Sequence, residues 1–261
     1  MAWLQIDLHS RALHRQVPVN VLLPIDPREP GPLPQGPFPT LYLLHGVTDN
    51  HASWLLNTRI AELSARHGVC VVLPAGENSF YLDQADRFAL WDTYVGRELV
   101  DLTRACLPLS RRREDTWIGG FSMGGCGALR NGLKYHATFG AVVALSAALE
   151  LAYTLESTYD EPNFLFNRGF VEGHYGDLEA ALHSDRNPLW LIEHLAREDF
   201  PRLFLASGEQ DMLSQVQGGV VSALEARGVS ADHRVVPGAH DWDFVNRVLP
   251  DALAWLSARQ G

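Results

Sequence analysis

Residues 116–130 read TWIGGFSMGGCGALR, and this stretch combines three local signals in a fixed order. An apolar run over 116–121 indicates a buried strand, a G-x-S-x-G pattern follows at 120–124, and small and apolar residues then favour a helix. A strand, a sharp turn and a helix together are the setting of a nucleophile elbow. In that setting Ser122 would stand at the tip of a strained turn.

The glycines of the motif have a physical reason. A serine held in so sharp a turn brings neighbouring backbone very close, so a Cβ at Gly120 or Gly124 would collide with it. The turn would place the Ser122 hydroxyl at the carboxyl edge of the sheet, where a helix N-terminus favours developing negative charge. The competing interpretation is a turn of small residues that only packs a helix closely on a strand.

Other short apolar runs surround this unit. Their hydrophobicity is continuous rather than alternating, which is typical of strands buried on both faces of a mostly parallel sheet. The runs lie at 40–44, 69–73, 139–145 and 202–206, after two further expected strands at 2–8 and 16–23. Helical patterns lie between them, at 53–67, 96–107, 122–135, 212–227 and 241–258. The alternation predicts a doubly wound α/β fold with helices flanking the central sheet.

Two segments interrupt the alternation. Residues 25–39 carry six prolines and read as a loop between strands, too short for a domain linker. Residues 147–200 contain scattered Gly, Pro and aromatic residues. They predict either a short cap-like insertion above the sheet or an ordinary connection with two helices.

A serine hydroxyl is a weak nucleophile that needs an adjacent base and an acid to orient that base. In this fold the order along the chain is serine, acid, histidine. His240 fits because it follows the apolar pair 235–236 of the last strand and precedes the last helix, whereas His233 is expected before that strand, at the opposite edge. His174, His183 and His194 fall in the insertion.

The predicted acid is Asp211, which follows the strand at 202–206, with Glu209 as the rival. Asp241 and Asp243 adjoin His240, but they open the final helix and suit its dipole as N-terminal carboxylates.

An oxyanion hole needs at least two fixed N–H donors. Met123, directly after the nucleophile, would supply one from its backbone, and Val47, in the loop after the strand at 40–44, would supply the other. Gly46 would permit close approach of that loop, His45 would support the turn, and Trp54 would pack beneath it.

Composition limits the partners. Lys and Arg number 21 against 31 Asp and Glu, so the net charge is −10, which disfavours nucleic acid and anionic membrane as partners. No apolar run is long enough for a transmembrane helix, and the N-terminus lacks the pattern of a signal peptide. Cys70, Cys106 and Cys126 show no CxxC spacing. Cys70 and Cys126 fit buried free thiols, which predicts a cytoplasmic protein.

Three segments together resemble the “putative esterase” family of α/β-hydrolases. They are LLHGVTDNHASW at 43–54, GGFSMGGCGA at 119–128 and GAHDW at 238–242. The resemblance extends over nearly the whole chain and looks closest to the tributyrin-esterase and esterase D branch. It implies the α/β-hydrolase fold, Ser122, Asp211 and His240 as triad, and Val47 and Met123 as oxyanion donors.

The resulting expectation is a serine carboxylesterase that hydrolyses short-chain acyl esters through an acyl-enzyme, with a small-molecule ester as substrate. No cofactor and no metal are expected. Residues 1–261 would form a single domain, because the oxyanion strand and the base lie near opposite ends of the chain.

Four points stay open. An acyltransferase or a thioesterase would use the same triad, although S-formylglutathione hydrolases of this family typically carry SGLTC where this chain reads HGVTD at 45–49. A non-catalytic binding protein is a third alternative. The sequence leaves the oligomeric state open, a homo-oligomer included.

Overall fold

The centre of the fold is an eight-stranded sheet with the strand order β1-β2-β4-β3-β7-β8-β9-β10. β1 pairs with β2, and β2 with β4, in antiparallel fashion, and the remaining neighbours are parallel. This computed structural model describes residues 1–26, 31–147 and 152–258. The strands are β1 (Ala2–Ser10), β2 (Arg15–Leu23), β3 (Thr40–Leu44), β4 (Cys70–Pro74), β7 (Thr116–Phe121), β8 (Ala141–Leu145), β9 (Arg202–Gly208) and β10 (Asp232–Val236). The predicted mostly parallel sheet is confirmed.

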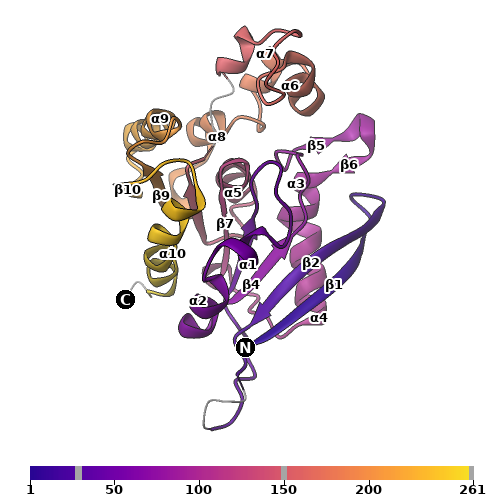
Figure 1. Ribbon diagram of the computed structural model, residues 1–261, viewed down its shortest axis with the longest axis vertical. Helices are drawn as coiled ribbons and strands as arrows, with labels where there is room; N and C mark the ends of the chain where they lie inside the picture. The colour runs from indigo at the N-terminus through magenta and orange to yellow at the C-terminus, as the bar shows by residue number, and fades with distance from the viewer. Residues whose placement is uncertain (27–30, 148–151, 259–261) are drawn as a thin grey trace.

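Helices cover both faces of this sheet (Figure 1). One apolar cluster joins the sheet to α1 (Ser53–Asn57), α2 (Ile60–His67) and α10 (Trp242–Ser257). A second cluster joins the other face to α4 (Leu99–Cys106), α5 (Met123–Lys134), α8 (Pro188–His194) and α9 (Ser214–Ala226). No helix of the described ranges is both long and apolar enough to cross a membrane.

Strand β3 shows why the apolar runs of the sequence are continuous. Tyr42 and Leu44 belong to one cluster, whereas Leu41 and Leu43 belong to the other. Successive side chains of a strand point to opposite faces, so a strand with a helical layer on each side needs apolar residues at every position.

Most predicted ends of elements shift by one or two residues, and three differences go further. The expected helix at 53–67 is two helices, because the Thr58 hydroxyl donates to Trp54 O and accepts from Ile60 N, and Thr58 itself is extended. The helix expected from 96 begins earlier, with α3 (Trp91–Thr93) and a wide turn over Tyr94–Glu98. His233 lies inside β10 rather than before it.

The region 147–200 combines the two arrangements that its sequence left open. In the upper part of Figure 1, α6 (Arg168–Tyr175) and α7 (Leu178–Leu182) stand above the sheet. α8 instead packs between α5 and α9 as an ordinary layer helix. Short turns at Ala152–Glu156 and Arg197–Asp199 complete the region, and 148–151 lie outside the described residues. A small hairpin, β5 (Asp83–Gln84) and β6 (Ala89–Leu90), extends from the same end of the molecule (Figure 1).

Candidate active site

Ser122 forms the predicted elbow between β7 and α5. Its backbone has φ 58° and ψ −120°, a conformation that residues with a side chain rarely adopt. A Cβ at Gly120 would lie 2.2 Å from Gly124 O, and one at Gly124 would lie 2.3 Å from Leu44 O. Both glycines are therefore required by close backbone contacts, as the motif predicted.

The structure brings Ser122, His240 and Asp211 together from three different strand ends. His240 lies in the loop between β10 and α10, and its Nε2 is 2.9 Å from Ser122 Oγ. Its Nδ1 is 2.9 Å from Asp211 Oδ2. The three residues are 118 and 29 positions apart along the chain, so only the parallel sheet makes them neighbours.

The loops after β9 and β10 are joined by their backbones, which fixes Asp211 against His240. A Cβ at Gly208 would lie 2.2 Å from Gly238 O, so only glycine allows the two loops to approach. The Gln210 N–H donates to Gly238 O at 3.0 Å, and the Gly238 N–H donates back to Gln210 Oε1 at 3.0 Å.

Of the two acids left by the sequence, Asp211 is the one that faces the imidazole. Glu209 is exposed, and its side chain contacts Gln210 Nε2 at 3.4 Å instead.

Asp211 is held ionised by its neighbours. Burial of its side chain would raise its pKa, but hydrogen bonds from His240 and from the Leu213 backbone N–H outweigh burial and lower that pKa. An ionised Asp211 keeps a proton on His240 Nδ1, so Nε2 is left to accept the Ser122 hydroxyl proton. The His240 ring also lies over Phe121, with 4.7 Å between the ring centroids.

The two expected oxyanion donors belong to separate segments that meet near Ser122. Met123 is the first residue of α5, so its N–H has no acceptor within the helix. A Cβ at Gly46 would lie 3.6 Å from Ser122 Cβ, so the loop that carries Val47 passes directly beside the serine. Within the described ranges, the Val47 N–H donates no hydrogen bond.

His45 supports this loop and does not face Ser122. Its Nε2 accepts the Gly76 N–H at 2.9 Å, so Nδ1 carries the proton and donates to Gly46 O at 2.7 Å. Burial lowers the pKa of His45 and keeps the ring neutral. The buried Trp54 indole donates to Leu44 O at 3.0 Å, at the end of the strand that leads into the loop. Both residues occupy the supporting positions predicted for them.

Asp241 also lies where the sequence placed it. Its carboxylate caps α10 by accepting the Phe244 N–H at 2.9 Å. As for a metal, the described part of the chain contains no group of three or more His, Cys, Asp or Glu side chains that could hold one.

Sequence reasoning missed two features next to the site. One is the segment 76–81, which follows β4 and contacts the loop of Val47. The other is a buried ion pair between Arg130 and Asp92. The sequence did contain a signal for the segment 76–81. Polar residues that directly follow a parallel strand lie at the edge of the sheet where the other parallel strands also end.

Known proteins resemble this chain over nearly its whole length. The family model described as “Putative esterase” matches residues 10–256. The chain belongs to this family. It is 37% identical to an acetyl esterase of Caldicellulosiruptor saccharolyticus, over 98% of each chain. It is also 25% identical to an S-formylglutathione hydrolase of Paracoccus denitrificans, over 97% of this chain and 91% of that one.

A solved structure with the same fold is FphF, a fluorophosphonate-binding serine hydrolase of Staphylococcus aureus. The two chains superpose with a TM-score of 0.86 and 26% identity, over 99% of each. The family match confirms the resemblance drawn from the sequence, and the superposition confirms the α/β-hydrolase fold class.

Proposed function

We propose that this chain is a serine carboxylesterase that hydrolyses short-chain acyl esters, with Ser122 as nucleophile. The observation that carries the proposal is the unbroken chain of contacts from Ser122 Oγ to His240 Nε2 and from His240 Nδ1 to Asp211, at 2.9 Å each. A hydroxyl, an imidazole and a buried carboxylate in this order are the arrangement that activates a serine.

In the first half of the reaction, His240 Nε2 takes the Ser122 proton as Oγ attacks the ester carbonyl carbon. The carbonyl oxygen becomes an oxyanion, which the N–H groups of Val47 and Met123 stabilise. His240 then gives its proton to the leaving alcohol as the C–O bond breaks, and the acyl group stays on Ser122. Asp211 holds the imidazole and stabilises its charged form throughout.

In the second half, a water molecule replaces the alcohol. His240 takes a proton from the water, the hydroxide attacks the acyl carbon, and the proton returns to Ser122 as the acid leaves. Both halves use the same oxyanion donors.

The acetyl esterase relative makes acetyl esters the first substrates to test. A thioester is the second candidate, because S-formylglutathione hydrolases are found among the sequence relatives and the solved structures. An acyl-chain series of aryl esters beside S-formylglutathione separates these two. Product analysis with a competing alcohol separates hydrolysis from acyl transfer.

The experiment on the proposal is the Ser122→Ala variant. Turnover should fall at least ~10³-fold, because the nucleophile is lost while binding and the oxyanion hole remain. The midpoint of denaturant unfolding should not fall. Ser64→Ala is a matched control, since Ser64 is a buried serine whose hydroxyl donates to Val69 O on another part of the fold. Near wild-type turnover in Ser122→Ala would overturn the proposal.

We propose one catalytic domain over 1–261, supported by a site whose parts come from residues 45 to 240, with α6 and α7 of the 147–200 region as its cap. A cytoplasmic location fits the free cysteines, of which Cys70 and Cys126 are buried and Cys106 is exposed. The acidic net charge of −10 favours a small-molecule ester over nucleic acid as partner.

A further inference from the structure

We propose that Tyr81 is a positioning residue for the oxyanion loop, which we define as residues 45–48. In this role Tyr81 keeps the Val47 N–H aligned with the Met123 N–H. The inference rests on the proposed function, since it assigns a task to a residue outside the triad. Its basis is a set of contacts between the oxyanion loop and the segment 76–81.

Three hydrogen bonds fasten the oxyanion loop on both sides of Val47. Before Val47, the Tyr81 hydroxyl donates to His45 O at 3.0 Å, and the Gly76 N–H donates to His45 Nε2 at 2.9 Å. After Val47, the Thr48 N–H donates to Asn78 Oδ1 at 2.7 Å. The segment 76–81 thus satisfies the polar groups that flank Val47 and leaves the Val47 N–H itself free for a ligand.

Tyr81 is itself fixed. It is fully buried, with 0% of its surface exposed, and burial raises its pKa well above the usual value, so its hydroxyl stays a donor. Its backbone has φ 54°, and its N–H donates to Ser79 Oγ at 3.0 Å. A Cβ at Gly76 would lie 2.2 Å from the Tyr81 ring, so no side chain fits between the ring and its own segment.

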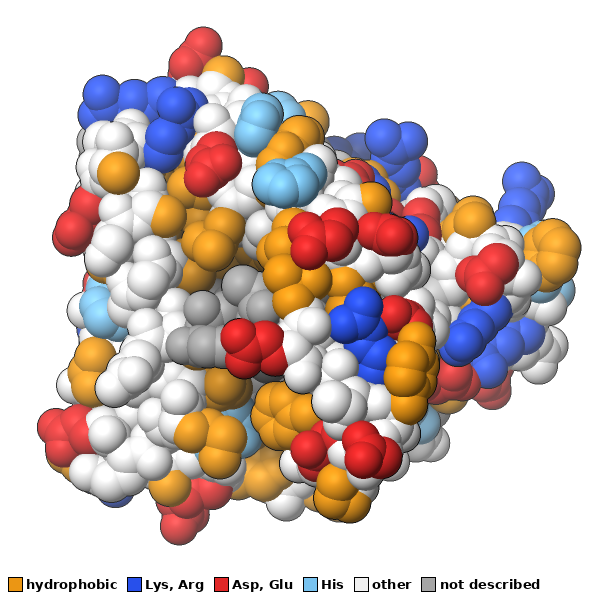
Figure 2. Space-filling model, turned by 90° about the horizontal axis from the view of Figure 1, so that it is seen from above, with side chains coloured by type: hydrophobic (Ala, Val, Ile, Leu, Met, Phe, Trp, Pro, Cys, Tyr) orange, Lys and Arg blue, Asp and Glu red, His pale blue; other side chains and the backbone are white. Residues whose placement is uncertain are grey.

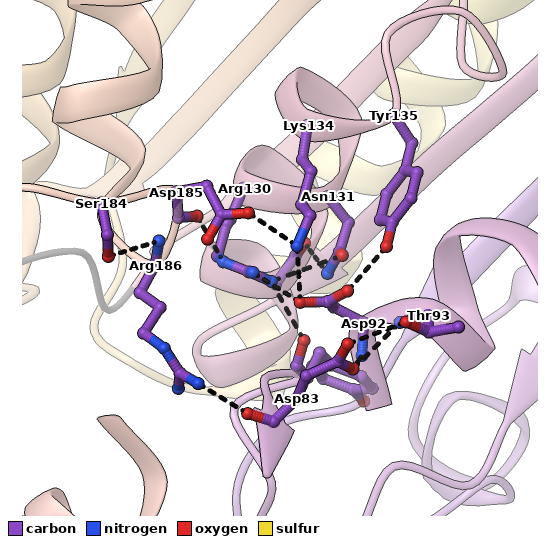
Figure 3. Close-up of polar contacts among 12 residues, drawn as sticks. Asp83, Asp92, Thr93, Arg130, Asn131, Lys134, Tyr135, Ser184, Asp185 and Arg186 are labelled. Atoms are coloured by element: carbon purple, nitrogen blue, oxygen red, sulfur yellow. Dashed lines mark hydrogen bonds and ion pairs between the residues drawn. The ribbon is translucent and has the colours of Figure 1, made fainter. Parts of the chain in front are cut away.

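The same residue also contacts the helix that carries the other oxyanion donor. A Cβ at Gly127 of α5 would lie 2.5 Å from Tyr81 Cδ2, so the ring packs directly on that helix. Arg130, one turn further along α5, donates to Tyr81 O at 3.2 Å and pairs with Asp92 at 2.7 Å. Figure 3 shows the contact between Arg130 and Asp92.

These contacts give Tyr81 a position between the two donors. Met123 begins α5, and Val47 lies on the oxyanion loop, two elements with no covalent link nearby. Tyr81 contacts α5 with its ring and its carbonyl and the loop with its hydroxyl. Alignment of two donors on one oxygen matters most when charge develops there, so a loss of alignment should lower kcat and leave substrate binding nearly unchanged.

The test is Tyr81→Phe, which removes the hydroxyl and keeps the ring. Its matched control is Tyr42→Phe, because Tyr42 is also fully buried and its hydroxyl forms a hydrogen bond with Thr103 in the core, at 2.8 Å. With an aryl acetate as substrate, Tyr81→Phe should lower kcat about tenfold, less than the loss of a whole donor, with KM within about twofold. Affinity for an alkyl boronic acid, which forms a tetrahedral adduct on Ser122, should fall by a similar factor.

Asn78→Ala is a second variant, which removes the side-chain acceptor of the Thr48 N–H and leaves the two hydrogen bonds to His45 in place. It should show the same split between kcat and KM, and it changes a half-buried surface residue, so it stays informative if Tyr81→Phe fails to fold. Equal kcat and equal boronic acid affinity in Tyr81→Phe, Tyr42→Phe and wild type would overturn the inference. An inactive wild type would instead overturn the proposed function, so the two failures are distinguishable.

Discussion

Asp211 and Asp92 are both buried aspartates, yet their surroundings prepare them for different tasks. Their side chains are 0% and 2% exposed. Asp211 lies at the carboxyl edge of the sheet and faces a single imidazole, whose other nitrogen reaches Ser122. Asp92 lies beside α5 and accepts hydrogen bonds from Arg130, Lys134 and Tyr135, as the cluster in Figure 3 shows.

The electrostatics of the two carboxylates are similar, so they do not tell the two tasks apart. Burial alone would raise the pKa of Asp92, but Arg130, Tyr135 and Lys134 outweigh it and lower that pKa to about 2. The pKa of Asp211 is lowered as well, against burial, by its hydrogen bonds. The two carboxylates differ in the groups that they contact. Asp92 contacts Arg130 and Lys134, which keep their charge, whereas Asp211 contacts His240, which can take up and release a proton. A buried ionised carboxylate therefore marks a reactive site only through the group that it orients.

The largest expected effect comes from Asp211→Asn. An amide in this position can stabilise the wrong tautomer of His240 and cannot stabilise its charged form, so kcat should fall about 10⁴-fold. The amide oxygen can still accept the Leu213 N–H, so stability should change far less than activity. Steady-state kinetics and a denaturant titration of the same preparation check both parts. A variant that loses stability but keeps its kcat would contradict the catalytic role proposed for Asp211.

Asp92→Asn should show the opposite pattern. Removing one charge of a buried pair leaves Arg130 uncompensated, so the free energy of unfolding should fall by about 3–5 kcal/mol. The kcat of the remaining folded protein should stay within about threefold of wild type, because Asp92 contacts none of the reacting groups. Urea unfolding monitored by tryptophan fluorescence, with active-site titration to count folded molecules, measures the two quantities separately.

The sequence could predict Asp211 but not Asp92, and the reason is physical. Asp211 follows a recognisable strand, and the carboxyl ends of the parallel strands in this fold lie at one edge of the sheet. The place of Asp211 in the sequence therefore predicts where it lies in the structure. The same rule predicts that Ser122, His240 and the oxyanion loop lie at this edge. Asp92 lies in no such pattern, and its partner Arg130 is 38 residues away on a helix whose buried residues are mostly glycine or apolar.

Other features escaped prediction for related reasons. The break of the expected helix at Thr58 depends on a side chain that bonds to its own backbone, which competes with helix formation without changing the hydrophobic pattern. The role of Tyr81 depends on a positive φ and on contacts across two loops. Neither leaves a periodic signal in the sequence.

Lowering the pH should remove the contribution of Asp92 to the free energy of unfolding. The folded-state pKa of Asp92 is about 2 and lies below its ordinary value, so the unfolded chain binds the proton first as the pH falls. The stability that Asp92 contributes is complete above about pH 5 and is lost as the pH falls from about 4 towards 2, a difference of about 2 kcal/mol. The difference in unfolding free energy between wild type and Asp92→Asn should therefore shrink by about 2 kcal/mol in acid. A constant difference between pH 2 and 5 would contradict this account of the cluster.

Asp241→Ala should have the smallest effect, although Asp241 is the sequence neighbour of His240. Its carboxylate caps α10 and does not contact the imidazole, so the change should cost about 1 kcal/mol of stability. The kcat should stay within about twofold of wild type. Thermal unfolding and steady-state kinetics check this pair of values, and Asp241→Asn, which retains a capping oxygen, should recover most of the stability.

The most direct measurement of the central claim is the site of covalent modification by a fluorophosphonate probe. Wild type, Ser122→Ala and Asp211→Asn would be treated with the probe under identical conditions and digested for mass spectrometry. The account predicts an adduct on Ser122 in wild type, slower modification of the same residue in Asp211→Asn and no adduct in Ser122→Ala. An adduct on another residue, or esterase activity that survives in an unlabelled Ser122→Ala protein, would contradict it.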